Sequence, residues 1–411
     1  MKKFTNLSVL AVVALFVFMY SCQMENDVEP TASLELEEAR LITYSSETAI
    51  PGKYIVVFKE NAFPTVKSSA ISSENYGEAK EEMQSLAESF LLSNRIKAKT
   101  IERSFVKAIT GISLELTDQE LDQIRTDDRV AYIEQDQIIT VSMGGPPGGG
   151  GGGGGGSNPQ VTPYGIARVN GGVSGVGKVA YIIDSGIDAS HPDLNVDVAS
   201  GFNAFTSGPD RDLTYDGSGH GTHVAGTVAA IDNEIGVIGV AAGATVVPVK
   251  VLNRRGSGST SGVIAGVDYV AGQSDCDAAN MSLGGGVSTA LDNAVVAASS
   301  NCPFALAAGN SSAPANNSSP ARAQGNNIYT VASMTSSDTW SSFSNYGVND
   351  NPVDYIAPGS SVLSTYNGDG YATLSGTSMA SPHVCGLLLL GNITSGGTVA
   401  GPDGNYTVAS R

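Results

Sequence analysis

The sequence of 411 residues is poor in basic side chains and in long apolar runs, and each shortage excludes a class of protein. It has 22 lysines and arginines against 40 aspartates and glutamates, for a net charge of −18. A phosphate backbone is bound by clustered basic residues, so a nucleic-acid partner is excluded. Beyond the first twenty positions no apolar stretch is long enough to cross a bilayer, so we expect no transmembrane helix.

The first residues have the pattern of an export signal. Lys2 and Lys3 precede an apolar stretch at 7–19, which is short enough for a signal core and too short for a span. We expect a signal peptide at 1–22 and a polar tether at 23–48. Cys22 stands where a bacterial lipoprotein carries its lipidated thiol. Two outcomes stay open: ordinary cleavage with secretion, or a lipid anchor at Cys22 that would hold the protein to the cell envelope and be its sole membrane contact.

Three further cysteines lie in the second half of the chain. Cys276 and Cys302 each stand just before a short apolar segment that reads as a strand. If these two strands are neighbours, the two thiols can form a disulfide, which an exported protein permits. Cys385 lies in an apolar helical stretch and is expected to be a buried free thiol.

Residues 49–142 read as a small α+β unit. Apolar residues alternate in the predicted strands, and Thr117 with Glu120 forms a capping box that opens a helix. The predicted strands cover 53–58, 111–116, 130–134 and 138–141, and the predicted helices cover 78–94 and 118–125.

A glycine-rich segment follows this unit. Residues 144–156 are Gly-Gly-Pro-Pro and then nine glycines, which offer no side chains to bury. We therefore expect a flexible linker at 143–157 that is open to proteolysis.

Residues 158–411 show apolar runs that alternate with helical stretches. Runs that are almost continuously apolar are typical of strands buried on both faces, and helices between them indicate βαβ units. We predict an α/β domain with a mostly parallel sheet and helices on both faces, with its active residues at the carboxyl ends of the strands. The predicted strands cover 179–183, 245–251, 278–283, 304–308 and 328–331.

Three segments of this domain carry residues suited to nucleophilic catalysis: Tyr181-Ile-Ile-Asp-Ser-Gly-Ile-Asp188, His220-Gly-Thr-His-Val-Ala-Gly-Thr227 and Ser375-Gly-Thr-Ser-Met-Ala-Ser-Pro-His383. A serine hydroxyl becomes a nucleophile when an imidazole takes its proton, and a buried carboxylate fixes the tautomer of that imidazole. From residue types alone, nearby carboxylates and imidazoles compete for these roles, namely Asp188, Asp193, His191, His223 and His383.

Together the three segments resemble the signature motifs of the subtilase family, in its order of Asp, His and Ser. The resemblance runs from about Gln160 to the end of the chain, and residues 341–347 resemble proteinase K relatives. Residues 49–142 are similar to the family's inhibitory propeptide, which implies a ferredoxin-like domain before a subtilisin-like peptidase. The implied activity is that of a secreted serine endopeptidase that works through an acyl-enzyme, is made as a self-processing precursor and has broad, apolar specificity.

The resemblance also assigns roles within the site. It selects Asp184 over Asp188 and His220 over His223, with Ser378 as the nucleophile. His383 is expected to be helical scaffold. Asn310, which follows an apolar strand, matches the family's oxyanion residue and would act with the backbone N–H of Ser378.

Substrate and calcium contacts follow from the same resemblance. The segment Ser282, Leu283 and Gly284 would pair with an extended substrate as an added strand, and with Ala307, Ala308 and Gly309 it would wall a roomy apolar pocket. Six oxygen donors would suit a structural Ca²⁺, the alternative being a metal-free surface loop. These donors are Gln160, Asp193, Ile231, Asn233, Ile235 and Val237.

The expected partners are extended or unfolded polypeptides and the chain's own propeptide. The last propeptide strand would lead residues near Ser142 and Met143 into the cleft, so we expect self-cleavage between about Ser142 and Ser157. Two rival interpretations stay open: an inactive subtilase fold that only binds, and a processing enzyme that cuts only itself or one partner. The 33 residues after Ser378 read mainly as turns and leave little for a final helix.

Overall fold

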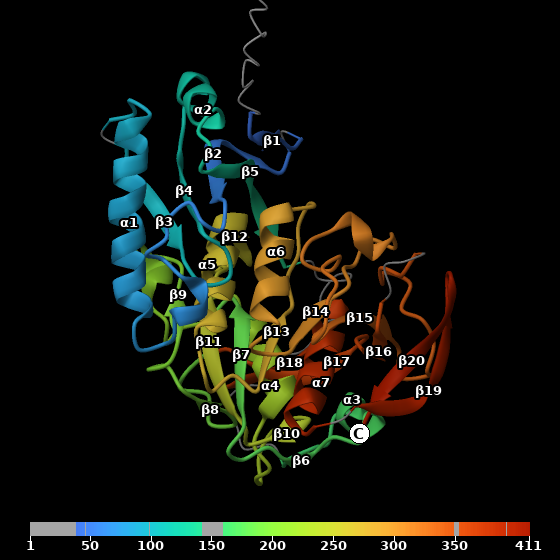
Figure 1. The fold of residues 1–411 in the computed structure, drawn as a ribbon. Helices are drawn as coiled ribbons and strands as arrows, with labels where there is room; N and C mark the ends of the chain where they lie inside the picture. Colours follow the sequence, from blue (N-terminus) through green and yellow to red (C-terminus); the bar gives the residue numbers. More distant parts are fainter. Residues whose placement is uncertain (1–37, 46, 98, 142–158, 349–352, 392) are drawn as a thin grey trace, which may run out of the picture. The chain divides into compact units, whose positions relative to one another are not determined.

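The computed structural model describes residues 38–141 except 46 and 98, residues 159–348, and residues 353–411 except 392 (Figure 1). These residues belong to one unit, Glu37–Arg411. The expected signal peptide at 1–22 with Cys22, most of the tether, and the linker at 143–157 with its cleavage site lie outside the described residues. Within the described part of the chain, no helix is long and apolar enough to span a bilayer.

The inhibitor-like region, residues 38–141, forms a sheet with two α-helices and one short 3₁₀ helix. The strand order is β1-β5-β2-β4-β3, and the predicted strands at 130–134 and 138–141 are one strand, β5. The capping box at Thr117 opens the second helix at the predicted residue. The strands are β1 (Arg40–Ile42), β2 (Ala49–Phe58), β3 (Ile101–Phe105), β4 (Gly111–Glu115) and β5 (Val130–Thr140), and the helices are η1 (Ser68–Ala70), α1 (Tyr76–Ser93) and α2 (Asp118–Arg125).

The two faces of this small sheet are both buried. Val56 packs into a core with α1 and α2. Its neighbours Ile55 and Val57 join a core that includes helices α5 (Thr260–Ala271) and α6 (Thr289–Ala298) of the expected peptidase domain, called the peptidase region below. Successive side chains of a strand point to opposite faces, so one strand serves both cores. The sheet therefore packs with one face on its own helices and the other on the peptidase.

The end of the expected polar tether is not irregular. Arg40–Ile42 forms β1, which runs parallel to β5 along Tyr132–Glu134. Leu41 packs against the inhibitor core, and its apolar side chain gives this short segment a reason to order. The ordered structure thus begins before residue 49.

The peptidase region is built on a ten-stranded sheet of order β19-β20-β16-β15-β14-β13-β7-β11-β8, with β9 beside β11. All neighbours are parallel except the pair β19 and β20, as predicted for a mostly parallel sheet. The strands of this sheet are β7 (Val179–Asp184), β8 (Asn195–Val196), β9 (Phe202–Asn203), β11 (Thr245–Lys250), β13 (Ala278–Met281), β14 (Phe304–Ala307), β15 (Ile328–Met334), β16 (Tyr355–Pro358), β19 (Thr394–Gly401) and β20 (Gly404–Ser410).

Helices cover both faces of this sheet, as predicted (Figure 1). On β7, Tyr181 and Ile183 face α5 and α6, whereas Ala180 and Ile182 face α4 and α7. The helices are α3 (Tyr164–Arg168), η2 (Pro209–Arg211), α4 (His220–Ala229), α5 (Thr260–Ala271), α6 (Thr289–Ala298), η3 (Ala315–Asn317) and α7 (Thr377–Leu389), and the remaining strands are β6 (Val173–Ser174), β10 (Ala241–Ala242), β12 (Ser257–Ser259), β17 (Val362–Tyr366) and β18 (Gly370–Leu374).

The closing segment is a hairpin where turns were expected. Strands β19 and β20 pair antiparallel, and β20 joins the sheet through Val408 beside Ile356. Val399 and Tyr406 are buried, and the Tyr406 ring lies 4.8 Å from that of Trp340. Their burial gives the hairpin an apolar face that the glycines around it conceal in the sequence.

The cysteines have the arrangement considered from the sequence. Strands β13 and β14 are parallel neighbours, and Cys276 and Cys302, just before them, form a disulfide with a Cα–Cα distance of 5.6 Å. Cys385 is a buried free thiol in α7, as expected. Burial raises the pKa of its thiol far above the ordinary value, so it stays uncharged and inert.

The end of β5 lies against the peptidase. Ile138, Ile139 and Thr140 pair antiparallel with β12, and Thr140 also bridges to Gly284 on its other side. Both flanking segments therefore receive the end of the inhibitor-like region as an added strand.

Candidate active site

Three side chains singled out in the sequence stand at the carboxyl edge of the peptidase sheet. Asp184 is the last residue of β7, His220 is the first residue of α4, and Ser378 is the second residue of α7. Helices α4 and α7 pack against each other on the same face of the sheet (Figure 1). Strand ends and helix starts thus converge where such sheets place their active residues.

Asp184 and His220 form a buried pair. The Nδ1 of His220 lies 2.8 Å from Oδ1 and 3.0 Å from Oδ2 of Asp184. A carboxylate can only accept here, so Nδ1 carries the proton and Nε2 presents its lone pair. Asp184 is 0 % and His220 2 % exposed, so water does not weaken the pair.

The same pair sets the basicity of the imidazole. Burial by itself lowers the pKa of His220, but the charge and hydrogen bond of Asp184, joined by the charge of Asp216, raise it above the ordinary value. A buried carboxylate that favours the protonated ring is what a general base needs when it takes a proton.

Ser378 forms hydrogen bonds with Ser282 and not with this pair. Its hydroxyl donates to the carbonyl oxygen of Ser282 at 3.1 Å, and the Ser282 hydroxyl donates to the Ser378 carbonyl at 2.8 Å. Nε2 of His220 is buried and has no hydrogen-bond partner among the described residues. The structure therefore records the predicted Asp–His bond and does not record a bond from His220 to Ser378.

Two glycines beside His220 allow the start of α4 to pack closely against neighbouring segments. Gly219 caps α4 with φ at +78°, a region where glycine is favoured, and a Cβ there would collide with the ring of Tyr366. A Cβ on Gly221 would collide with the carbonyl oxygen of Gly186, two residues after Asp184. The glycines let α4 start in contact with Tyr366 of β17 and with the loop that follows β7.

The competing histidines are engaged elsewhere. Nε2 of His223 lies 3.1 Å from two backbone carbonyl oxygens, and burial lowers its pKa to about 3. Nδ1 of His383 lies 2.9 Å from the Met379 carbonyl oxygen, and burial lowers its pKa to about 4. His191 lies 3.0 Å from the Gly370 carbonyl oxygen. All three are placed as scaffold.

The competing carboxylates are engaged as well. Asp188 accepts bonds from Ser190 and, at 2.8 Å, from the backbone N–H of Gly368. Asp193 accepts a bond from the backbone N–H of Val237 at 3.0 Å. Neither is recorded as a partner of His220, and Asp184 is.

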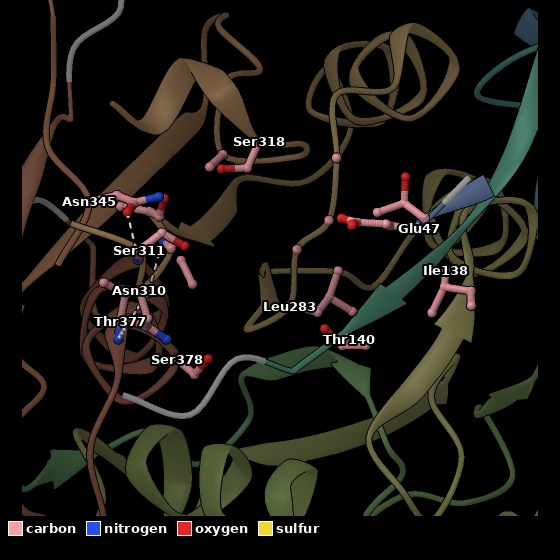
Figure 2. Close-up of a pocket in the computed structure, with 18 residues that line it drawn as sticks. Glu47, Ile138, Thr140, Leu283, Asn310, Ser311, Ser318, Asn345, Thr377 and Ser378 are labelled. Atoms are coloured by element: carbon pink, nitrogen blue, oxygen red, sulfur yellow. Dashed lines mark hydrogen bonds between the residues drawn. The ribbon is translucent and has the colours of Figure 1, made fainter. Parts of the chain in front are cut away.

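Asn310 is held by the start of α7. Its Oδ1 accepts from the backbone N–H of Thr377 at 2.8 Å and from the Thr377 hydroxyl at 3.0 Å (Figure 2). An N–H can only donate, so these bonds fix which end of the amide is oxygen. The NH₂ group must then point away from Thr377, and Figure 2 shows Asn310 beside Ser378 in the same cavity.

A second asparagine holds the loop that carries Asn310. Oδ1 of Asn345 accepts from the N–H groups of Ser311 at 2.9 Å and Ala313 at 3.1 Å, and its Nδ2 donates to the Ala308 carbonyl at 3.0 Å. This buried side chain thus uses both ends of its amide on one loop.

A cavity of about 390 Å³ lies beside Ser378 (Figure 2). Among the described residues, the peptidase side chains that line it are small or uncharged, and the one carboxylate is Glu47 of the inhibitor-like region. Ser282 is buried behind the wall, in contact with Ser378. Five of the predicted substrate residues line the cavity, namely Leu283, Gly284, Ala307, Ala308 and Gly309.

The residues predicted to bind calcium are also brought together. Asp193 accepts from the Asn233 side chain at 2.9 Å, Asn233 accepts from the Ile235 N–H at 2.8 Å, and Gln160 accepts from the Asn233 N–H at 2.5 Å. The Ile231 N–H donates to the carbonyl oxygen of Asp193 at 3.0 Å. The site has one central carboxylate, and in the described part of the chain no group of three or more His, Cys, Asp or Glu could hold a metal.

The donor set nevertheless fits a hard cation. Asp193 is fully buried, and burial raises the pKa of its carboxyl despite bonds from Val237, Asn233 and Tyr371. A buried carboxylate is stabilised by a cation, and amide and carbonyl oxygens are ligands that Ca²⁺ accepts.

Sequence reasoning missed three residues that organise the site. Thr377 precedes the nucleophile candidate and orients Asn310, and Asn345 lies in the segment noted for its resemblance to proteinase K relatives. Asp216 lies in the loop before His220 and is fully buried. For Asp216, the available signal in the sequence was its position four residues before the candidate base His220.

Comparison with known proteins identifies both regions. Residues 177–391 match the subtilase family, and residues 53–142 match the family described as peptidase inhibitor I9. A cold-adapted subtilisin-like serine proteinase of known crystal structure is 43% identical, with 57% of this chain and 85% of that chain covered and a TM-score of 0.49.

Curated relatives extend the match. The alkaline serine exoprotease A of Vibrio alginolyticus is 37% identical over 382 residues, which cover 89% of this chain and 66% of that protein, just under two thirds of its length. The extracellular serine proteinase of Thermus sp. (strain Rt41A) is 39% identical over 368 residues, which cover 88% of this chain and 84% of that protein. The M-protease of Shouchella clausii (strain KSM-K16) is 38% identical over 291 residues, 69% of each chain. The chain therefore belongs to the subtilase family of serine proteases and carries an I9-type propeptide domain.

Proposed function

We propose that this chain is the precursor of a secreted serine endopeptidase whose triad is Asp184, His220 and Ser378. The hydroxyl of Ser378 turns from the Ser282 carbonyl toward Nε2 of His220, gives up its proton and attacks the scissile carbonyl. The imidazolium then protonates the leaving amine, and the acyl-enzyme is hydrolysed by water in the reverse sequence. Asp184 keeps the imidazole in the required tautomer.

The observation that supports this most strongly is the buried pair of Asp184 and His220 with Nε2 left without a partner among the described residues. A buried nitrogen without a hydrogen bond costs free energy, and active sites are where such a cost is kept. Catalytic hydrogen bonds are often absent before substrate binds, so the bond of Ser378 to Ser282 is compatible with the role.

Asn310 is proposed as the oxyanion donor. The bonds from Thr377 to its oxygen fix which end of the amide is the NH₂ donor, and this donor would act on the developing oxyanion together with the backbone N–H of Ser378. Donors fixed before the reaction stabilise charge without reorganisation, and removing one costs about 10²–10³ in kcat, a magnitude known from a related subtilisin.

Extended polypeptides are the proposed substrates. The propeptide strand β5 already pairs with β12 and bridges to Gly284, and a substrate segment can use the same edges. The uncharged peptidase residues of the cavity, among them Leu283 and Ala308, favour apolar side chains with broad tolerance.

The precursor organisation is likewise a proposal. It comprises a signal peptide at 1–22, a tether at 23–48, an inhibitory propeptide at 49–142, a linker at 143–157 and the peptidase at 158–411. Self-cleavage falls between about Ser142 and Ser157. The pairing of β5 with β12 supports it, because Thr140 at the end of that strand lines the same cavity as Ser378. The mass of the secreted protein reports this bond, and a diacylglyceryl adduct at Cys22 would show lipid anchoring in place of release.

The direct test compares secreted wild type with Ser378→Ala on casein and on a peptide library. We expect the variant to stay uncleaved and to lose about 10⁶-fold in kcat, a magnitude taken from another subtilisin. Equal cleavage by the two proteins would contradict the triad, and no cleavage by either would favour a fold that only binds. A library in which wild type cuts one motif would instead favour the processing enzyme of narrow specificity.

We also propose that Gln160, Asp193 and Asn233, with the carbonyl oxygens of Ile231, Ile235 and Val237, hold a structural Ca²⁺. Bound calcium would neutralise the buried carboxylate of Asp193 and tie the chain near Gln160 to the loop before β10.

Thermal melting tests this site in the Ser378→Ala background, where self-digestion does not interfere. Calcium at 100 times its dissociation constant adds about 2.7 kcal/mol of stability, which raises Tm by roughly 5–10 °C over a chelator control. Asp193→Asn should abolish the difference, whereas Asp338→Asn, at an exposed position bonded to Arg168, should retain it. An equal Tm with calcium and with chelator in the parent would contradict the calcium site.

A further inference from the structure

Asp216 is a buried carboxylate that neither the triad nor the calcium site uses. It lies in the loop between η2 and α4 and is 0 % exposed. Its Oδ1 accepts from the Ser185 hydroxyl at 2.9 Å and from the N–H groups of Ser218 at 3.1 Å and Gly219 at 2.9 Å. Its Oδ2 accepts from the N–H and hydroxyl of Thr222 at 2.9 Å and 2.8 Å. Five hydrogen bonds thus converge on one carboxylate.

These bonds connect the two segments that carry Asp184 and His220. The N–H of Ser185 donates to Oδ1 of Asp184 at 2.7 Å. The hydroxyl of Ser185 donates to Asp216 and accepts from the N–H of Gly221, next to His220, at 3.0 Å. The hydroxyl of Ser185, the residue after Asp184, is therefore bound directly to the backbone of Gly221, the residue after His220.

The other end of the network fixes α4 itself. Thr222 donates to Asp216 and accepts, through its hydroxyl, from the N–H of Asp188 at 3.0 Å. The Asn367 side chain donates to the Asp216 carbonyl at 2.9 Å, and the Tyr366 hydroxyl donates to the Ser218 carbonyl at 2.9 Å. The loop of Asp216 is thus braced from the β17–β18 hairpin as well.

We propose that Asp216 is a positioning residue for the reaction, which holds the loop after β7 and the start of α4 in register so that Asp184 and His220 meet. It is also the second anion near the imidazolium that forms in the transition state. The proposal rests on the proposed function, because positioning has a catalytic consequence only if the pair is part of a triad. A misplacement of about 1 Å in such a pair can cost roughly 10²-fold in rate.

Several charged or titratable groups face His220 and must be considered together. Asp184 raises its pKa most, and Asp216 adds to that effect. His223, one turn along α4, is neutral at working pH because burial lowers its pKa to about 3. Lys250 on β11 donates to the Ser185 carbonyl, and burial lowers its pKa although Asp216 and Asp184 act to raise it. Removing the charge of Asp216 alone therefore lowers the pKa of His220.

The test is the pH profile of kcat/KM for Asp216→Asn, measured on a peptide chromophore beside wild type. The amide of asparagine offers one acceptor oxygen in place of two. Its NH₂ group would face either the donors of Thr222 or the donors of Ser185, Ser218 and Gly219. We expect kcat to fall roughly 10- to 100-fold with KM nearly unchanged. We also expect the acid limb to move to lower pH, a shift that a purely structural role would not cause.

Asp212→Asn is the matched control. Asp212 lies four residues earlier in the same loop, is exposed, and accepts bonds from Thr214. The change removes the same charge and should leave kcat and the acid limb at wild-type values. A wild-type kcat and acid limb in Asp216→Asn would overturn the positioning role.

A second variant decides the case if Asp216→Asn gives no mature enzyme. Ser185→Ala keeps the charge of Asp216 and removes the hydroxyl that links it to Gly221. We expect kcat to fall roughly 5- to 20-fold, with the acid limb unmoved. A wild-type kcat in Ser185→Ala would overturn the proposal, and an active Ser378→Ala would instead overturn the proposed function.

Discussion

The active site and the inhibitor-like region satisfy their buried carboxylates in different ways. In the peptidase, Asp216 is bound entirely by groups of its own region, from Ser185 to Thr222. In the inhibitor-like region, Glu134 and Asp136 on β5 find their partners across the interface. Glu134 accepts from the N–H of Ala290 at 2.9 Å, at the start of α6.

Asp136 repeats this arrangement on the neighbouring helix. It accepts from the N–H of Ser261 at 3.0 Å and from the Ser261 hydroxyl at 2.6 Å, at the start of α5. The first turn of a helix has unpaired N–H groups and a partial positive charge, which a carboxylate stabilises. The propeptide thus caps two peptidase helices.

One buried carboxylate of the peptidase region, Asp268, is bound by groups of the inhibitor-like region. Asp268 on α5 accepts from the N–H groups of Val106 at 3.2 Å, Lys107 at 2.8 Å and Ala108 at 2.7 Å, and from the Tyr76 hydroxyl at 2.8 Å. The peptidase site is organised without its partner, whereas the propeptide depends on the peptidase for its buried charges. This difference would let the site persist once the propeptide leaves, as the proposed maturation requires.

Among substitutions at the interface, Asp268→Ala should weaken propeptide binding the most. The change leaves the N–H groups of Val106, Lys107 and Ala108 without their acceptor, so the propeptide should bind the mature enzyme roughly 10²-fold more weakly. The inhibition constant of added propeptide measures the change.

Glu47 supplies the control on the propeptide side. Its carboxylate also lies at the interface, in the wall of the cavity, but it is exposed. Exposed charges contribute little, so Glu47→Ala should change the inhibition constant less than about threefold. Equal effects of the two substitutions would contradict the distinction between buried and exposed carboxylates.

A smaller change in the strength of propeptide inhibition is expected from a change in pH. Burial, with a contribution from the charge of Glu134, raises the pKa of Asp292 to about 6 from 3.8, and burial also raises the pKa values of Glu134 and Asp136. A carboxyl with a raised pKa binds its proton more readily in the complex than outside it, so lower pH favours the complex. Inhibition should therefore tighten severalfold as pH falls from about 6 to 4.

The inhibition constant measured at each pH, corrected for the enzyme's own pH profile, tests this linkage. Glu134→Gln removes one titrating group and the charge that acts on Asp292, so it should flatten the dependence. Inhibition that weakens toward acid pH in wild type would contradict the expected sign.

The peptidase fold was more predictable from sequence than its closing segment. Continuous apolar runs such as 179–183 and 304–308 can be satisfied in few ways other than as buried parallel strands. Strand β3 and the hairpin of β19 and β20 depend on contacts made far away in the chain, as between Tyr406 and Trp340, and their local patterns are diluted by polar residues and glycines.

The residues of the site also divide into those that the sequence indicated and those that it did not. Asp184, His220 and Asn310 follow strands or open helices, so sequence position indicated them. Asp216 and Asn345 act by binding backbone N–H groups of loops. The position of Asp216 four residues before His220 was a weak signal, and no local pattern marked Asn345 as an amide that would be buried.

Active-site labelling tests the central claim most directly. A mature enzyme treated with an organophosphorus serine reagent and mapped by peptide mass spectrometry should carry one adduct, on Ser378, and His220→Ala should abolish it. An adduct on another serine, or an unmodified Ser378 in enzyme that still cleaves peptides, would contradict the assignment.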